Sequence, residues 1–557
     1  MGNDKIDKTK NYKTSASKTS KSNKNRNLKD RKKYINAKGC ENSKSNVSDK
    51  DMYQDPFWYG KDITAIKDMA SFPWLEIVGT RIKGTATDAV PGIMALTYRH
   101  AINTSALQDG SLDNRFGNYA TRAARAYYNY VVQGFSSSVP FEAPDLMMTA
   151  LAAASLRSWM LEGRRAYTVL AYYVMQNKYY AADIMRGLGF DYDDWIANKA
   201  RFRAEYNLRV RAMNNTLVIP KGLFISDRWD FIASNLFTDT TSPDYSSLMG
   251  YINRAALKFD ATTARYGTCL KWKETTTPSK LLTVTDFFNI VDDLLNALND
   301  DDVRSIFASV LRVYPVSNLK MLMEITDESP DMPVFRNDVV AATFHNAIWA
   351  NTPAESNTTK AYCRTDAAFM LNGQDSNEVV IYQDQSGNIL TRLIGKSTTT
   401  EPSINNPSKA LATHVILDMY DNLVTPENVL DITVSMQVAG TMETGVSGTY
   451  PIYCRSEYIT GLYVLGDFTS TDGSYNPIMN PVLDNWNGTF TPSLCALTHI
   501  DSFPIVPFRS TGAGTPIQGY LGELDKYTTI PGDTLALLHD RCQFNMLLMP
   551  ENTKSIT

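Results

Sequence analysis

The chain has 557 residues, of which 43% are hydrophobic and 20% charged, and its net charge is −4. This length exceeds what one hydrophobic core supports and predicts two or three domains. The six cysteines stand singly, with no C-x-x-C pair, which is typical of reduced thiols in an intracellular protein and not of a disulfide framework. We expect neither a signal peptide nor a membrane anchor, because no apolar run approaches the roughly 20 residues that cross a bilayer.

Residues 1–51 form a basic segment unlike the rest of the chain. Fifteen Lys and Arg against five Asp and Glu give residues 1–50 a net charge of +10, so the remaining residues carry −14. We expect a disordered arm, because so polar a segment buries too little apolar surface to offset its ordering entropy. Neutralising phosphates releases counterions and gives RNA affinity without base recognition. The basic residues expected to contact RNA are Lys5, Lys8, Lys10, Lys13, Lys18, Lys21, Lys24, Arg26, Lys29, Arg31, Lys32, Lys33 and Lys38.

The pattern of residues 52–335 predicts a mainly α-helical domain. Apolar residues recur at helical spacing between Asn114 and Gly134. The segment from Leu146 to Leu161 is apolar on nearly every face, which indicates a central buried helix that Gly163 should end. Further helices are expected over 166–177, 191–213, 283–298 and 301–315, the third of them beginning with a capping pair, Thr283 and Asp286.

The pattern of apolar and polar residues predicts a β-rich domain over residues 336–505. Residues 378–382 and 389–394 flank a short polar turn and predict a hairpin. Apolar and polar residues alternate from Leu430 to Val438, which predicts a half-buried strand. A helical pattern returns at Asp533, and we expect residues 506–557 to join the helical domain. The fold class expected is α+β, with a disordered arm, a mainly helical domain over 52–335 and a β-rich domain over 336–505.

The groups that a catalytic or metal site needs are missing from the sequence. The five histidines lie far apart, without a metal-ligand spacing, and structural roles are expected for them. The segment from Gly79 to Thr85 has glycines at the distance of a phosphate-binding loop but lacks the lysine that should follow the second glycine. Asp193 and Asp194 open a helix, where acids favour the positive end of the dipole. We therefore expect no enzyme activity, no cofactor and no metal.

One predicted helix in the body is rich in basic residues, and its role has two interpretations. Glu205 stands at helical spacing from both Arg201 and Arg209, which favours a solvated face with local ion pairs. The same cations would also suit a surface that lines an RNA-filled cavity. The basic residues of this helix are Lys199, Arg201, Arg203, Arg209 and Arg211.

Three features together resemble the capsid proteins of picobirnaviruses. They are the Lys/Ser/Asn-rich arm, the helical domain that contains residues 140–145 (PFEAPD) and 159–165 (WMLEGRR), and the β module rich in Thr, Ser and Gly. The resemblance implies an icosahedral shell built from homodimers, with a helical shell domain, a protruding β-rich domain and an arm that faces packaged double-stranded RNA. It also implies a virion protein assembled in the host cytoplasm, and leaves room for an encapsidated polymerase as a partner.

Two other functions fit the same sequence. A non-capsid nucleoprotein or replication accessory factor would share the basic arm but coat RNA in proportion to its length. An RNA-modifying enzyme would need a metal or acid cluster formed by residues distant in sequence. The arm itself could also be a simple solubility extension.

Overall fold

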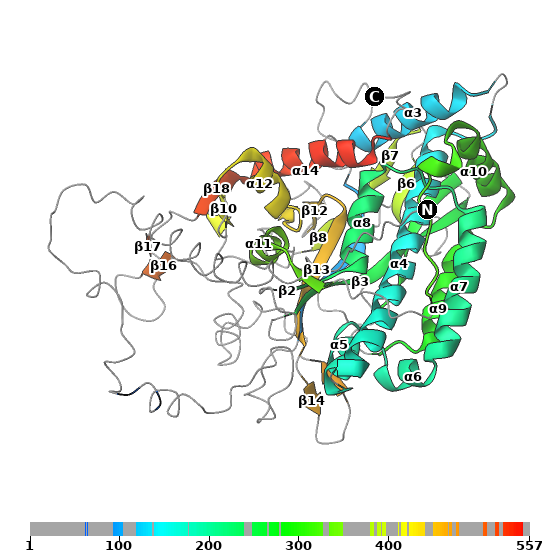
Figure 1. Ribbon diagram of the computed structural model, residues 1–557. Coiled ribbons are helices and arrows are strands. Elements are labelled where there is room, and N and C mark those ends of the chain that lie inside the picture. Colours follow the sequence, from blue (N-terminus) through cyan, green and yellow to red (C-terminus); the bar gives the residue numbers. More distant parts are fainter. Residues whose placement is uncertain are drawn as a thin grey trace, which may run out of the picture. The chain divides into compact units, whose positions relative to one another are not determined.

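The computed structural model is α+β, with a mostly helical core beside several sheets (Figure 1). Residues 76–557 make one compact unit. The structure describes residues 62, 64, 93–103, 118–135, 139–176, 178–238, 248–263, 267–277, 280–326, 334–348, 379–383, 387–391, 393–396, 410–411, 414–419, 423–439, 449–465, 467–469, 475–477, 505–508, 519–522 and 527–549.

The largest sheet collects strands from distant parts of the chain. Its order is β13-β1-β3-β4-β6-β7, and β2 joins β3 to β5 beside this path. The strand β1 pairs in parallel with β3 and antiparallel with β13, and the remaining pairs along the main path are antiparallel. The strands of this sheet are β1 (Ile93–His100), β2 (Leu236–Thr238), β3 (Leu248–Thr263), β4 (Gly267–Glu274), β5 (Val334–Arg336), β6 (Val379–Gln383), β7 (Ile389–Thr391) and β13 (Glu457–Leu465).

The smaller sheets lie in the C-terminal part of the chain. Their strands are β8 (Ile394–Lys396), β9 (Ala410–Leu411), β10 (His414–Asp418), β11 (Val438–Ala439), β12 (Thr449–Tyr453), β14 (Asp467–Thr469), β15 (Tyr475–Pro477), β16 (Ile505–Phe508), β17 (Gly519–Gly522) and β18 (Tyr527–Pro531). The predicted hairpin of residues 378–394 is confirmed by the pairing of β6 with β7. Because β6 also pairs with β4, this hairpin extends the sheet that the N-terminal strands begin.

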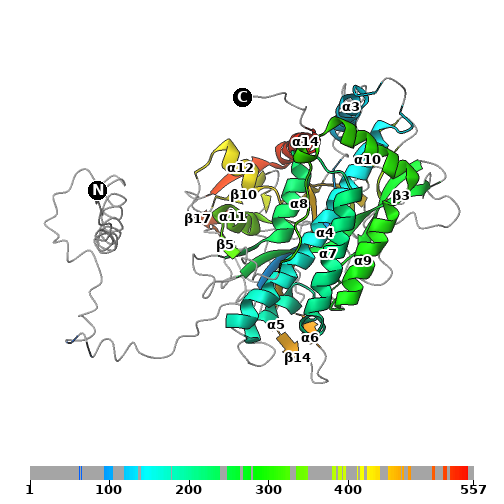
Figure 2. The same ribbon diagram turned by 45° about the vertical axis from the view of Figure 1, so that its right-hand side comes forward.

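Helices of the described part of the chain lie beside these sheets. They are α3 (Tyr119–Val132), α4 (Ala143–Gln176), α5 (Lys178–Gly187), α6 (Tyr192–Ala197), α7 (Lys199–Thr216), α8 (Phe224–Ser234), α9 (Val284–Ala297), α10 (Asp301–Val313), α11 (Asp338–Asn346), α12 (Pro426–Ile432) and α14 (Gly532–Leu547), with a 3-10 turn, η5 (Val316–Asn318). The long helix α4 packs on β3 and β4 and contacts α8 on one side and α9 on the other (Figures 1 and 2). The predicted C-terminal helix is confirmed as α14, which packs against α3 and α8.

Three local predictions need correction. Gly163 does not end a helix, because α4 runs through it to Gln176 and absorbs the helix predicted over 166–177. The helix predicted over 191–213 is interrupted at Asn198, whose side-chain amide donates to the carbonyl and carboxylate of Asp194. The strand predicted from Leu430 to Val438 is also wrong, because α12 and a turn occupy most of it.

Other local signals are confirmed. Thr283 and Asp286 form the predicted capping box of α9, each side chain bonding to the other residue's backbone N–H. Asp191 caps α6, and Asp193 and Asp194 lie in its first turn as expected. The segment from Gly79 to Thr85 lies outside the described residues.

Candidate nucleic-acid interface

The arm and the basic helix are the two places where the sequence predicts RNA contact. The basic residues of the arm, from Lys5 to Lys38, lie outside the described residues, so their role stays a prediction. The basic helix is α7, which the structure describes in full.

Acidic side chains from three segments pair with three of the arginines of α7. Arg201 donates to Glu205 at 2.7 Å within the helix. Arg209 forms a two-pronged pair with Asp292 of α9, at 2.8 and 2.6 Å. Arg211 forms a similar pair with Glu324, at 2.8 Å for both bonds.

The environment of Arg209 shows that this cation serves the packing of α7 on α9. Its guanidinium lies 4.2 Å from the centre of the Phe288 ring and also donates to Glu205. The hydrogen bonds that Arg209 donates to Asp292 raise the pKa of Arg209 above its ordinary value. Cation–π and paired hydrogen bonds of this kind fix a helix–helix interface. Of the two interpretations of this helix, the contacts favour local ion pairs.

A second set of charges lies inside the protein, between α4 and the main sheet. Arg165 is buried and donates to the carbonyls of Ile232 and Tyr251, while Tyr98 donates to Glu162 at 3.1 Å. Burial raises the pKa of Glu162 to about 7. Because these groups bond to backbone carbonyls and to each other, they position α4, α8 and the strands and face no substrate.

The pair of Arg228 and Glu457 holds α8 against β13, the end strand of the main sheet. Arg228 of α8 donates to Glu457 of β13 at 2.8 Å, and the Trp229 indole donates to the Ser456 carbonyl at 2.9 Å. These contacts bind a helix from the N-terminal half to a strand more than two hundred residues later. Removing one partner of such a buried pair would cost several kcal/mol, roughly 3–5.

Three of the described histidines hold structural positions. The His100 ring lies 2.8 Å from the Ser155 hydroxyl, and burial lowers its pKa to about 3. His539 bonds to Arg455, and His345 lies 3.2 Å from Asp418. Within the part of the chain that the structure describes, no three His, Cys, Asp or Glu side chains gather as a metal site would require.

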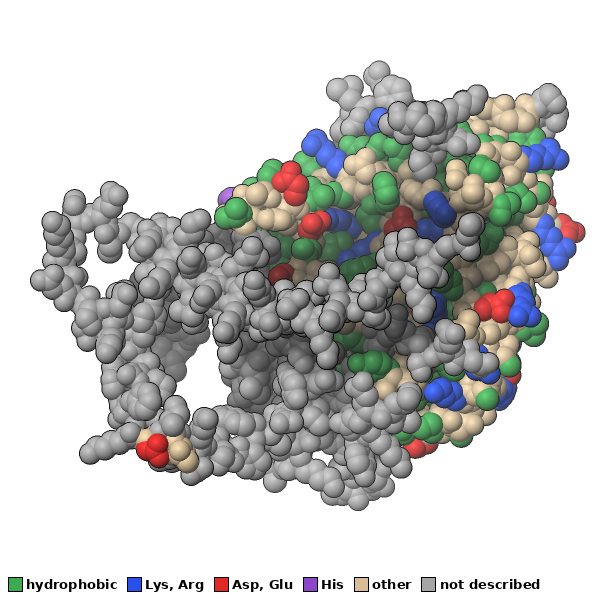
Figure 3. Space-filling view, viewed as in Figure 1, with side chains coloured by type: hydrophobic (Ala, Val, Ile, Leu, Met, Phe, Trp, Pro, Cys, Tyr) green, Lys and Arg blue, Asp and Glu red, His purple; other side chains and the backbone are tan. Residues whose placement is uncertain are grey.

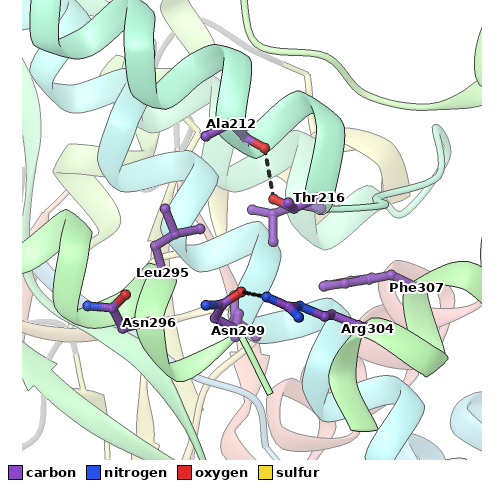
Figure 4. Close-up of a pocket in the computed structure, with 9 residues that line it drawn as sticks. Ala212, Thr216, Leu295, Asn296, Asn299, Arg304 and Phe307 are labelled. Carbon is purple, nitrogen blue, oxygen red and sulfur yellow. Dashed lines mark hydrogen bonds between the residues drawn. The ribbon is translucent and has the colours of Figure 1, made fainter. Parts of the chain in front are cut away.

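A cavity of about 180 Å³ opens where α7, α9 and α10 meet (Figure 4). Its floor is apolar, with Leu295 and Phe307 among the lining residues. Three of its polar lining side chains are engaged: Arg304 donates to Asn299 at 2.6 Å, and Thr216 donates to the Ala212 carbonyl at 2.9 Å. The cavity therefore lacks the free acid, base or nucleophile that catalysis uses.

Glu205 was predicted from its spacing as a partner of Arg201 and Arg209, but two other partners of the basic helix could not be found by local pattern. Asp292 and Glu324 lie 83 and 113 residues from the arginines that they bind. Among the described helices, none is long and apolar enough to act as a membrane span. Over the helices visible in Figure 3, acidic and basic side chains are interspersed and do not gather by sign.

Comparison with known proteins identifies the class of protein. A solved structure titled as the X-ray crystallographic structure of the picobirnavirus capsid has the same fold, with a TM-score of 0.69 and 19% identity, covering 90% of this chain and 100% of that chain. The "Capsid protein precursor" of human picobirnavirus (strain Human/Thailand/Hy005102/-) is 21% identical over 497 residues, or 86% of this chain and 84% of the relative. The class is that of viral capsid proteins, which are structural and non-enzymatic.

The family follows from a match to its model. The family model described as picobirnavirus capsid protein matches residues 76–425, well over half of the chain. The chain therefore belongs to the picobirnavirus capsid protein family, as the resemblance in its sequence indicated, and is a component of the virion. Membership in this family decides between the three functions that the sequence left open, in favour of the capsid protein.

Proposed function

We propose that this capsid protein associates as homodimers, that these dimers build an icosahedral shell in the host cytoplasm, and that the arm of residues 1–51 packages RNA inside it. A helical shell domain over 52–335, joined by residues 506–557, and a protruding domain over 336–505 complete the proposal. An encapsidated polymerase would be a further partner.

The observation that carries the packaging role is the division of charge along the chain. Residues 1–50 carry +10, and the remainder carries −14. Many copies of such an arm enclosed in one shell would offset part of the phosphate charge of packaged RNA, whereas an acidic body would repel it. Packaging needs no base readout, so it needs no base-reading side chains on the body.

The contacts of α7 support the same assignment. Its arginines Arg201, Arg209 and Arg211 are bound by acids of the chain itself. A cation already paired gains less from a phosphate, because the carboxylate must be displaced or left beside a second anion. These pairs support the assignment of RNA recruitment to the arm.

Deleting residues 1–51 tests this function. We expect the shortened chain to form shells that carry little RNA, measured as the ratio of absorbance at 260 and 280 nm in purified particles. A full-length variant with the thirteen predicted RNA-contacting residues changed to Gln is the matched control for arm length, and it should lose RNA to the same extent. Shortened particles that carry as much RNA as intact ones would refute the role of the arm.

A further inference from the structure

An exposed apolar surface lies beside the basic helix. Leu208 of α7 is 66% exposed, and in the segment that follows η5 Met323 is 68% exposed and Met321 40%. Asn207 bonds to Ile325, Arg211 to Glu324 and Asn214 to Leu322, so residues 322–325 run antiparallel alongside α7 between its residues 207 and 214. We call the surface formed by Leu208, Arg211, Met321, Met323 and Glu324 the α7 face.

Side-chain hydrogen bonds from α7 fix the backbone of the segment that carries Met321 and Met323. Asn207 bonds to both backbone groups of Ile325, at 2.9 and 2.8 Å, and Asn214 does the same for Leu322, at 2.9 Å in both bonds. Leu322 and Ile325 are buried, at 5% each, while Met323 between them points outward. A preorganised surface of this kind loses little conformational entropy when a partner covers it.

The charges of the α7 face fit a protein better than a nucleic acid. Arg211 and Glu324 form an exposed pair, so the surface carries both signs around its apolar centre. The hydrogen bond from Arg211 lowers the pKa of Glu324, which keeps that carboxylate charged. A phosphate backbone would meet this anion, whereas a surface that presents both signs can meet another copy without net repulsion.

We propose that the α7 face is a contact between copies of this chain in the assembled shell. The inference rests on the proposed assembly and adds the residues that mediate it. Met and Arg are enriched at the cores of protein interfaces, and exposed apolar side chains beside a rigid backbone form the anchors of such contacts. Burying Leu208, Met321 and Met323 against a second copy would remove their apolar area from water.

Oxidative footprinting tests this contact without any substitution. Hydroxyl radicals are applied to intact particles, to RNA-free shells of the arm-deleted chain, and to subunits dissociated from particles. We expect oxidation of Met323 to fall several-fold in both kinds of shell relative to free subunits, with the buried Met147 unreactive in all three. Equal rates in shells and subunits would overturn the inference, and protection confined to RNA-filled particles would overturn it in favour of RNA.

A charge substitution tests the same surface by assembly. The double variant Leu208→Glu with Met323→Glu should remain folded, with an unchanged melting curve, but lose closed particles in electron microscopy and sedimentation. Leu423→Glu is the control, because Leu423 is 79% exposed beside α12, outside the α7 face, and particles should still form. Normal particles from the double variant would overturn this inference alone, whereas failure of the wild type to form shells would overturn the proposed function with it.

Discussion

Gly163 offers the sharpest test of how the helical core is packed. It lies inside α4, where a Cβ atom would stand 2.2 Å from Cζ of Phe287 and 2.7 Å from Cε2 of the same ring. The Phe287 ring stacks on Trp159 with 5.1 Å between centroids and lies edge-on to Trp195 at 5.7 Å, so it cannot withdraw freely. The glycine is therefore required by α9, which approaches α4 closely at this point.

Two opposing effects set the magnitude for Gly163→Ala. Alanine favours the helix over glycine by about 1 kcal/mol. Forcing a methyl group into a closely packed core costs typically 1–3 kcal/mol, and contacts below 3 Å place this site at the upper end. We expect a net loss of about 1–2 kcal/mol in the free energy of unfolding, against the gain that helix propensity alone predicts.

Urea unfolding of dissociated subunits, followed by tryptophan fluorescence, measures this loss. Gly532→Ala is the control, since a Cβ there meets only Val438 at 3.9 Å, and its effect should be small. Changing Phe287 to Leu should remove most of the penalty of Gly163→Ala, which a double-mutant cycle detects. If Gly163→Ala is as stable as the wild type or more so, the packing argument is wrong.

Two further predictions concern buried polar groups. Burial raises the pKa of Asp540 to about 7. Between about pH 4 and 7 the native state therefore holds a proton that the unfolded chain releases. The free energy of unfolding falls as pH rises through this window. In the variant Asp540→Asn the melting temperature should decline less with pH than in the wild type. The variant should be the more stable form at pH 8, by a few kcal/mol at most, on the order of 1.4 kcal/mol per pKa unit. Identical pH profiles of the two proteins would contradict this. Asn214→Ala removes both partners of the Leu322 backbone, at about 1–3 kcal/mol for each orphaned group. Hydrogen exchange at the Leu322 amide should quicken in this variant but not in Asn215→Ala, an exposed neighbour, and equal exchange in the two would refute the role of Asn214.

Local chemistry in the sequence predicted the elements whose signals are complete within a few residues. The capping pair at Thr283, the acids that open α6 and the hairpin of β6 and β7 all depend on neighbours in the chain. Gly163 misled because its reason lies on another helix, 124 residues away in sequence at Phe287. A glycine that ends a helix and one that admits a neighbouring ring look the same in sequence.

The error at residues 430–438 has a different physical cause. Alternation predicts a half-buried strand only when every second side chain meets water. Here Ile432, Thr433, Ser435 and Met436 are all buried, because the segment passes under other elements. The start of the helix was visible locally: Thr425 accepts a hydrogen bond from the Asn428 N–H, and Pro426 occupies the first turn.

The sequence predicted where the basic residues of the candidate site lie but not which acidic residues bind them. Composition locates an excess of positive charge in residues 1–50 and identifies α7 as basic. Which anions bind those arginines depends on how α7 lies against α9 and against the segment that carries Glu324, and that arrangement comes from burial of the apolar face containing Phe202, Tyr206 and Val210. The α7 face escaped prediction for the same reason, since Met321 and Met323 face outward only after the Asn207 and Asn214 bonds are made.

Three arginines of the body hold its own elements together. Arg165 bonds to backbone carbonyls, Arg228 to Glu457 and Arg209 to Asp292, each joining segments distant in sequence. Changing any of these would damage the fold before it changed RNA affinity. The proposed function assigns packaging to the arm, so a change in the charge of the arm should alter RNA content and leave the stability of the subunit unchanged. Packaging capacity would then follow the net charge of residues 1–50, and shell integrity would follow the contacts of the body.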